Sequence, residues 1–172
     1  MKPATFLARG PARSADPFAA TSPPIYQTAT FDQPSASGGG LYDYSRSGNP
    51  TRDLLERQLA RLEGAERALV FGSGIGAVAA AVRAVAAGGE VLAGDDLYGG
   101  SYRLLSQVLA GQGIAVRYVD LTDLEAVRAA LGPQTRLVLA ESPTNPLLRI
   151  VDLHGVATEA HAAGALLAVD GS

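Results

Sequence analysis

Short apolar segments alternate with longer amphipathic segments along residues 49–172, and this alternation limits the fold more than any other feature. Neighbouring parallel strands need a long crossover connection, which is usually a helix. The alternation therefore predicts an α/β fold, with a mostly parallel sheet and helices on both of its faces. The predicted strands are residues 68–71, 91–93, 114–119, 137–139 and 165–169. The predicted helices are residues 50–63, 75–87, 98–110, 122–131 and 152–163.

Two of these helices begin at recognisable capping residues. Asn49 stands directly before Pro50, and proline suits the first position of a helix. Thr122 is expected to cap the helix over residues 122–131, with Glu125 completing a capping box.

Residues 1–48 differ in composition from the rest of the chain. Their prolines and the run Gly38–Gly40 favour extended or irregular backbone over helix. We therefore expect two domains, an extended N-terminal arm over residues 1–48 and an α/β domain over residues 49–172.

Charge and hydropathy argue against several classes of protein. The net charge of −3 argues against nucleic-acid binding through basic patches. No apolar stretch approaches the roughly 18 residues that a membrane-spanning helix needs, so no membrane partner is predicted. The N-terminus lacks a signal-peptide cleavage site, and a cytoplasmic location is therefore expected.

The sequence predicts no metal site. Cysteine is absent, which excludes disulfides, thiolate nucleophiles and cysteine-based metal sites. His154 and His161 are seven positions apart, whereas a helical metal-binding pair needs the i, i+4 spacing.

Polar residues follow the predicted strands, at the edge of a parallel sheet where ligands bind. The glycine-rich turn from Gly72 to Ala77 opens a helix, whose free N–H groups would bind a phosphate. Two chemistries fit this turn. In the first, Gly72, Gly74 and Ala77 form a G-x-G-x-x-A dinucleotide motif, and Asp95 would bind the ribose.

In the second, the turn binds the single phosphate of pyridoxal 5′-phosphate (PLP). This hypothesis also gives roles to other residues at strand ends. Tyr98 could stack on the pyridine ring, and Asp170 could pair with the ring nitrogen and keep it protonated. The dinucleotide hypothesis leaves Tyr98 unexplained.

Five segments in order carry a family resemblance: YDYSRSGNPTR, LARLEGAERALVFGSGIGA, DDLYGGSYRL, ESPTNP and AVDGS. Over about residues 20–172 the chain resembles the PLP-dependent enzymes of Cys/Met metabolism. This transsulfuration family includes cystathionine γ-synthase, γ-lyase and β-lyase, and their homoserine sulfhydrylase and methionine γ-lyase relatives. The resemblance implies a fold-type-I, aspartate aminotransferase-like large domain, truncated after the fifth predicted strand.

The resemblance implies phosphate contacts from two subunits. Tyr44 and Arg46 resemble a pair that reaches the neighbouring subunit's cofactor phosphate, so a homo-oligomer, a dimer of dimers, is expected. Gly74 and Ile75 resemble the backbone donors to the phosphate in the chain's own site.

The resemblance also implies three contacts to the cofactor ring. Tyr98 resembles the stacking tyrosine, which is often given a catalytic proton-transfer role. Asn145 resembles the asparagine beside the 3-hydroxyl, and Asp170 resembles the partner of the pyridine nitrogen.

The full-length parent is expected to act by elimination or replacement on a sulfur amino acid or O-acyl-homoserine. The family's Schiff-base lysine lies beyond Asp170, whereas the only lysine of this sequence is Lys2. We therefore predict that the chain alone is inactive. The alternatives are a non-catalytic fragment or pseudoenzyme of the same family and a dinucleotide-binding domain.

Overall fold

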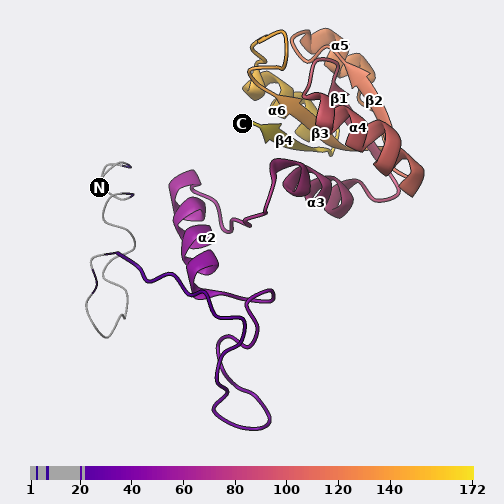
Figure 1. Cartoon of the computed structure of the whole chain (residues 1–172). Helices are drawn as coiled ribbons and strands as arrows, with labels where there is room; N and C mark the ends of the chain where they lie inside the picture. The colour runs from indigo at the N-terminus through magenta and orange to yellow at the C-terminus, as the bar shows by residue number, and fades with distance from the viewer. Residues whose placement is uncertain (1–2, 4–6, 8–19, 21) are drawn as a thin grey trace. The chain divides into compact units, whose positions relative to one another are not determined.

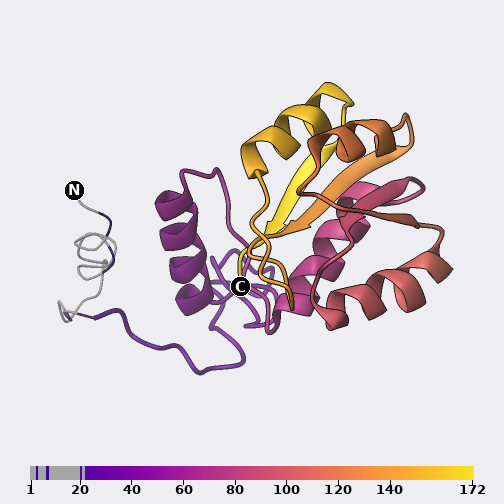
Figure 2. The same cartoon turned by 90° about the horizontal axis from the view of Figure 1, so that it is seen from above.

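The computed structural model describes residues 3, 7, 20 and 22–172, and the chain divides into two compact units. The first comprises Met1–Val70 and the second Phe71–Ser172 (Figure 1; Figure 2 gives a second view). Lys2 lies outside the described residues.

From residue 22 onward, the first unit contains an irregular segment and one helix. Residues 22–48 form no helix and a single antiparallel bridge, between Thr30 and Tyr44. Helix α2 (Pro50–Glu63) begins as the sequence predicted, because the Asn49 side chain accepts the Thr51 N–H at 2.9 Å. The helix ends at Gly64, which adopts φ 65°, a left-handed conformation that favours glycine.

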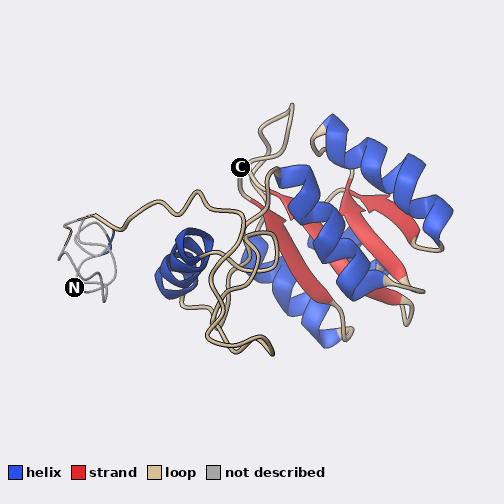
Figure 3. Ribbon diagram, turned by 60° about the horizontal axis from the view of Figure 1, so that its bottom comes forward, coloured by secondary structure: helices blue, strands red, loops and turns tan. Residues whose placement is uncertain are grey.

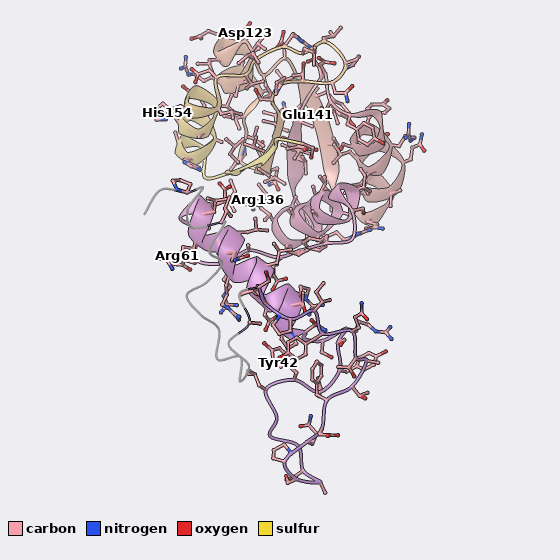
Figure 4. The ribbon with its side chains drawn as sticks, turned by 60° about the vertical axis from the view of Figure 1, so that its left-hand side comes forward. Tyr42, Arg61, Asp123, Arg136, Glu141 and His154 are labelled. Carbon is pink, nitrogen blue, oxygen red and sulfur yellow. The ribbon has the colours of Figure 1, made fainter. Side chains whose placement is uncertain are left out.

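The irregular segment is attached to the first turn of α2. The hydroxyl of Tyr42, which Figure 4 labels, donates to Asp53 at 2.7 Å, and the Asn49 side-chain amide donates to the Tyr26 carbonyl at 3.0 Å. Burial and the Asp53 carboxylate together raise the pKa of Tyr42.

The second unit is built on a parallel sheet of four strands in the order β2-β1-β3-β4. In this register Glu141 and Asp170 are partners at the carboxyl ends of β3 and β4. The strands are β1 (Glu90–Gly94), β2 (Ala115–Val119), β3 (Thr135–Glu141) and β4 (Leu166–Asp170).

The connections between these strands are helical and cover both faces of the sheet, as the alternation predicted (Figure 3). A π-helical turn η1 and a 3₁₀ turn η2 continue α4. The helical elements are α3 (Gly74–Ala86), α4 (Gly99–Arg103), η1 (Leu104–Leu109), η2 (Ala110–Gln112), α5 (Leu124–Ala130) and α6 (Leu153–Ala162).

Alternate strand residues face opposite sides, so the sheet separates two hydrophobic cores. On one side, Val91 and Leu137 join buried residues of α3 and η1. On the other side, Leu92 and Val138 join buried residues of α5 and α6. The middle strands β1 and β3 are therefore buried on both faces. This packing holds their carboxyl ends in place at one edge of the sheet.

The strand predicted over residues 68–71 is wrong. The segment forms no strand, and Leu69 and Phe71 are 72% and 42% exposed. Its apolar run resembles a buried strand in sequence, but the boundary between the two units falls at Val70. The glycine-rich turn therefore follows an irregular segment rather than a strand.

The predicted capping box at Thr122 is also wrong. Asp123 caps α5, since its carboxylate accepts the N–H groups of Glu125 and Ala126 at 3.0 and 3.1 Å. The Thr122 hydroxyl donates instead to Asp120, at 2.7 Å. A carboxylate at the N-cap accepts two of the free N–H groups of the first turn and adds a favourable charge at the helix N-terminus.

Candidate functional site

A hollow of about 450 Å³ lies between the start of α3 and the end of β4, and we call it the α3–β4 hollow. Its volume falls within the range of roughly 300–1,000 Å³ that is usual for small-molecule sites. Gly74 lines it on the α3 side and Asp170 on the β4 side. The remaining lining residues are Ala77, Val78, Ala81, Leu139, Ala168, Val169, Gly171 and Ser172.

The α3 N-terminus offers an anion two free N–H groups. Ser73 caps the helix, and its hydroxyl accepts the Gly76 N–H at 3.2 Å. Within the described residues, the N–H groups of Gly74 and Ile75 donate to no protein acceptor. An added Cβ at Gly74 would have no atom within 4 Å, so the space beside that N–H is open. These features suit a phosphate.

Two neighbouring carboxylates lie at the ends of β3 and β4, and one of them, Asp170, lines the hollow. Asp170 ends β4, and Glu141 ends β3 as its register partner. Burial raises the pKa of Glu141, and the charges of Asp170 and Asp96 raise it further, while a hydrogen bond from the Tyr98 N–H lowers it. Figure 4 labels Glu141 at this end of the sheet.

Tyr98 lies at the same edge of the sheet, where its backbone is hydrogen-bonded to Glu141. Its N–H donates to Glu141 Oε2 at 2.7 Å, which fixes the start of α4. The side chain is 47% exposed. Its ring lies against Gly100, where any side chain would collide with it.

Asn145 lies in the turn between β3 and α6, and its side chain is exposed. No hydrogen bond joins that side chain to another described residue. The preceding Thr144 is buried and bonds to Asp96. The turn therefore has a fixed backbone next to a free side-chain amide.

Tyr44 and Arg46 are brought together within the first unit. Arg46 Nη2 donates to the Tyr44 hydroxyl at 2.8 Å, and the guanidinium carbon lies 5.2 Å from the ring centroid. Tyr44 is 39% exposed, so the pair remains accessible to a further ligand.

Sequence reasoning missed two residues at this edge. Glu141 was visible only as a polar residue after a predicted strand, and nothing in the sequence connected it to Tyr98. Arg149 contacts Asp95, Asp96 and Asp120, which lie far from it in the sequence. A lone arginine after apolar residues carries no signal for such a cluster.

The structure does not provide the surroundings that a dinucleotide-binding motif requires. A dinucleotide motif requires a strand before its first glycine, and among the described residues no strand precedes Gly72. Asp95, the expected ribose ligand, instead accepts a hydrogen bond from Arg149 at 2.9 Å.

Among the described residues, no helix combines the length and the apolarity needed to cross a bilayer. The same part of the chain contains no group of three histidine or acidic side chains arranged to hold a metal ion.

Comparison with known proteins gives consistent matches. Residues 4–172 match the family described as Cys/Met metabolism PLP-dependent enzyme. The chain is 57% identical over 157 residues to the chloroplastic cystathionine beta-lyase of Mimosa pudica, covering 91% of this chain and 34% of that protein.

Solved structures of related proteins have the same fold over the whole length of this chain. The crystal structure of cystathionine gamma-lyase from Lactobacillus plantarum, complexed with L-serine, matches with a TM-score of 0.92 and 40% identity. Cystathionine gamma synthase from Xanthomonas oryzae pv. oryzae, in complex with aminoacrylate and cysteine, matches with a TM-score of 0.93 and 38% identity. Each match covers 100% of this chain but 45% of the solved chain, so the sequence spans less than half of these proteins.

Proposed function

Because the chain belongs to the Cys/Met metabolism PLP-dependent enzyme family, as its motifs predicted, we propose that it forms part of a transsulfuration enzyme. The reaction is elimination or replacement at the side chain of a sulfur amino acid or an activated homoserine. One observation carries this proposal: Gly74, whose N–H is free at the start of α3, and Asp170 line the same hollow.

The residues around the α3–β4 hollow fit PLP. The N–H groups of Gly74 and Ile75 suit its phosphate, and Asp170 suits a protonated ring nitrogen. Bound PLP supplies an electron sink for charge that develops at the substrate α-carbon. The chain's own part is to hold the phosphate and to keep a negative charge beside the ring nitrogen.

Tyr98 and Asn145 complete the proposed set at the sheet edge. The exposed Tyr98 ring is suited to stacking and its hydroxyl to moving a proton, which is the catalytic role we assign to it. The free Asn145 amide is suited to a hydrogen bond with the cofactor's 3-hydroxyl.

Tyr44 and Arg46 are proposed to bind the phosphate in a neighbouring subunit. A guanidinium pairs with a phosphate through two hydrogen bonds, and Arg46 already lies beside the Tyr44 hydroxyl. On this proposal residues 1–48 are an arm between subunits, residues 49–172 belong to the PLP-binding domain, and the protein is a homo-oligomer, specifically a dimer of dimers.

Cystathionine, a related sulfur amino acid and an O-acyl-homoserine are the candidate substrates. The matched proteins include a beta-lyase, a gamma-lyase and a gamma synthase, so the class of reaction is supported better than any single substrate. We propose a cytoplasmic location, although the Mimosa pudica relative is named as chloroplastic.

PLP binding by the 172-residue chain tests the proposal. Fluorescence titration should give saturable binding of PLP and none of NAD. Asp170→Asn should weaken PLP binding about tenfold, equivalent to about 1.4 kcal/mol, because the ring nitrogen loses its ionic partner. Glu125→Gln removes an equal charge from an exposed position outside the hollow and should leave the affinity unchanged. Absent PLP binding, or equal affinity in the Asp170 variant, would contradict the proposal.

The single lysine gives a second test. Borohydride reduction of the PLP mixture should trap no PLP on a lysine of this chain, and cystathionine should release no ketoacid. Release at the rate of an intact enzyme would show that the chain alone is catalytic. PLP binding without turnover is also what the non-catalytic alternative expects.

A further inference from the structure

We propose that Asp96, Thr144 and Arg149 form a positioning network that holds Asn145 at the sheet edge for the cofactor ring. The inference rests on the proposed function, because it assigns the network a purpose in PLP binding. None of the three residues is assigned to the cofactor itself, so each is a positioning residue.

The turn that carries Asn145 is closed by hydrogen bonds between its two ends. The Thr144 N–H donates to the Arg149 carbonyl at 2.9 Å, and the Arg149 N–H donates to the Thr144 hydroxyl at 2.8 Å. The Leu148 N–H donates to the Thr144 carbonyl at 3.0 Å. Thr144 thus contributes its N–H, its carbonyl and its hydroxyl to one short loop.

Asp96 attaches this loop to the end of β1. Its side chain is only 7% exposed, and Oδ2 accepts both the Thr144 hydroxyl and, at 3.2 Å, the Leu147 N–H. Asn145 is therefore flanked on both sides by residues bonded to a buried carboxylate. A buried carboxylate is costly unless its oxygens are satisfied, so this attachment has a defined geometry.

Arg149 connects the same loop to the ends of two strands through ion pairs. Its Nη2 lies 2.9 Å from Asp95 Oδ1, beyond β1, and its Nη1 lies 2.9 Å from Asp120 Oδ2, beyond β2. Burial lowers the pKa of Arg149, but the Asp95, Asp120 and Asp96 charges outweigh it and raise the pKa overall. The guanidinium remains charged and spans both carboxylates, which the point charge of a lysine would not do.

The network leaves the Asn145 amide free while fixing the backbone on either side of it. Ordering a flexible loop at the moment of binding costs conformational entropy for each residue ordered. A loop that is ordered beforehand avoids this cost, so the ligand keeps more of the interaction free energy. The network should therefore strengthen PLP binding without touching PLP.

The test compares four variants of the full 172-residue chain. Thr144→Val keeps the shape but removes the hydroxyl, whereas Thr144→Ser keeps the hydroxyl. Arg149→Met removes the guanidinium. Arg128→Met is the matched control, because Arg128 also bridges two carboxylates, Glu125 and Glu159, but does so between α5 and α6.

Two measurements are made, amide hydrogen exchange of residues 144–149 and PLP affinity by titration. In the Thr144→Val and Arg149→Met variants, exchange should accelerate at least about tenfold and PLP affinity should fall about three- to tenfold. Thr144→Ser should restore both values, and Arg128→Met should change neither.

Unchanged exchange in the Thr144→Val variant would overturn the network, whether or not the wild-type chain binds PLP. Faster exchange with full PLP affinity would overturn its role in positioning. A wild-type chain that binds no PLP would contradict both the proposed function and the role of the network in PLP binding. The exchange data would still show whether the network orders residues 144–149.

Discussion

Glu141 is the residue at which structural and electrostatic requirements conflict most clearly. Its carboxylate must accept the Tyr98 N–H, yet it lies beside Asp170 and near Asp96. Burial raises its pKa first, and the two neighbouring charges add to the effect. The ionised form therefore supports Tyr98 at a cost in electrostatic free energy.

Two substitutions separate these effects. Glu141→Gln keeps an oxygen acceptor for the Tyr98 N–H and removes the charge, so it should leave the free energy of unfolding at neutral pH unchanged or slightly higher. Glu141→Ala removes the acceptor and should cost about 1 kcal/mol. Urea unfolding of both variants measures this difference. Equal losses in the two variants would mean that the charge itself is needed.

The pH dependence of stability should distinguish the same variants. A carboxyl whose pKa is raised by folding binds its proton more tightly in the folded state. The wild-type chain should therefore gain stability, relative to Glu141→Gln, as the pH falls from neutral through the raised pKa toward the ordinary value of 4.5. A parallel pH profile in the two proteins would exclude an effect of Glu141 ionisation.

At the scale of elements, α5 shows how a single capping residue fixes a helix start. Asp123→Ala should destabilise the second unit by about 1 kcal/mol, because the N–H groups of Glu125 and Ala126 lose their acceptor. Glu125→Ala is the control. Glu125 pairs with Arg128 at the surface, and its side chain is 82% exposed, so its loss should have little effect. Thermal unfolding of the two variants measures the difference in stability. A larger loss of stability in Glu125→Ala than in Asp123→Ala would favour the predicted capping box.

Features set by contacts between residues close in sequence could be predicted from the sequence, whereas features set by distant contacts could not. Periodicity identified β1 to β4 and α2 to α6, because residues buried on one face of a strand or helix recur at a regular spacing in the sequence. It failed at residues 68–71, where an apolar run is exposed at the boundary between the units. It also failed to find Arg149, whose partners come from loops 29 to 54 residues away.

At the scale of the whole molecule, the proposed cofactor residues are divided between the two units. Tyr44 and Arg46 belong to the first unit, whereas Gly74, Tyr98 and Asp170 belong to the second. Motif order in the sequence predicted the set of residues, but it carried no distances. The pairing of Glu141 with Tyr98 needed the sheet register as well.

The second unit also has an apolar strand at the edge of its sheet. Within the described residues, β4 pairs with β3 alone, and Leu166 and Val169 are 55% and 44% exposed. An open strand edge with exposed apolar side chains can pair with another chain. We therefore expect the 172-residue chain to self-associate, with an apparent mass in size-exclusion chromatography that rises with concentration.

A charge placed on this edge should reduce the association. Leu166→Lys should move the chain toward the monomer, because a lysine on an edge strand disfavours strand pairing. Val108→Lys is the matched control, since Val108 is 45% exposed on η1 and adds the same charge away from β4. If both variants reduce association equally, net charge rather than the β4 edge controls it. If the wild-type chain elutes as a monomer at every concentration, the edge does not pair in solution.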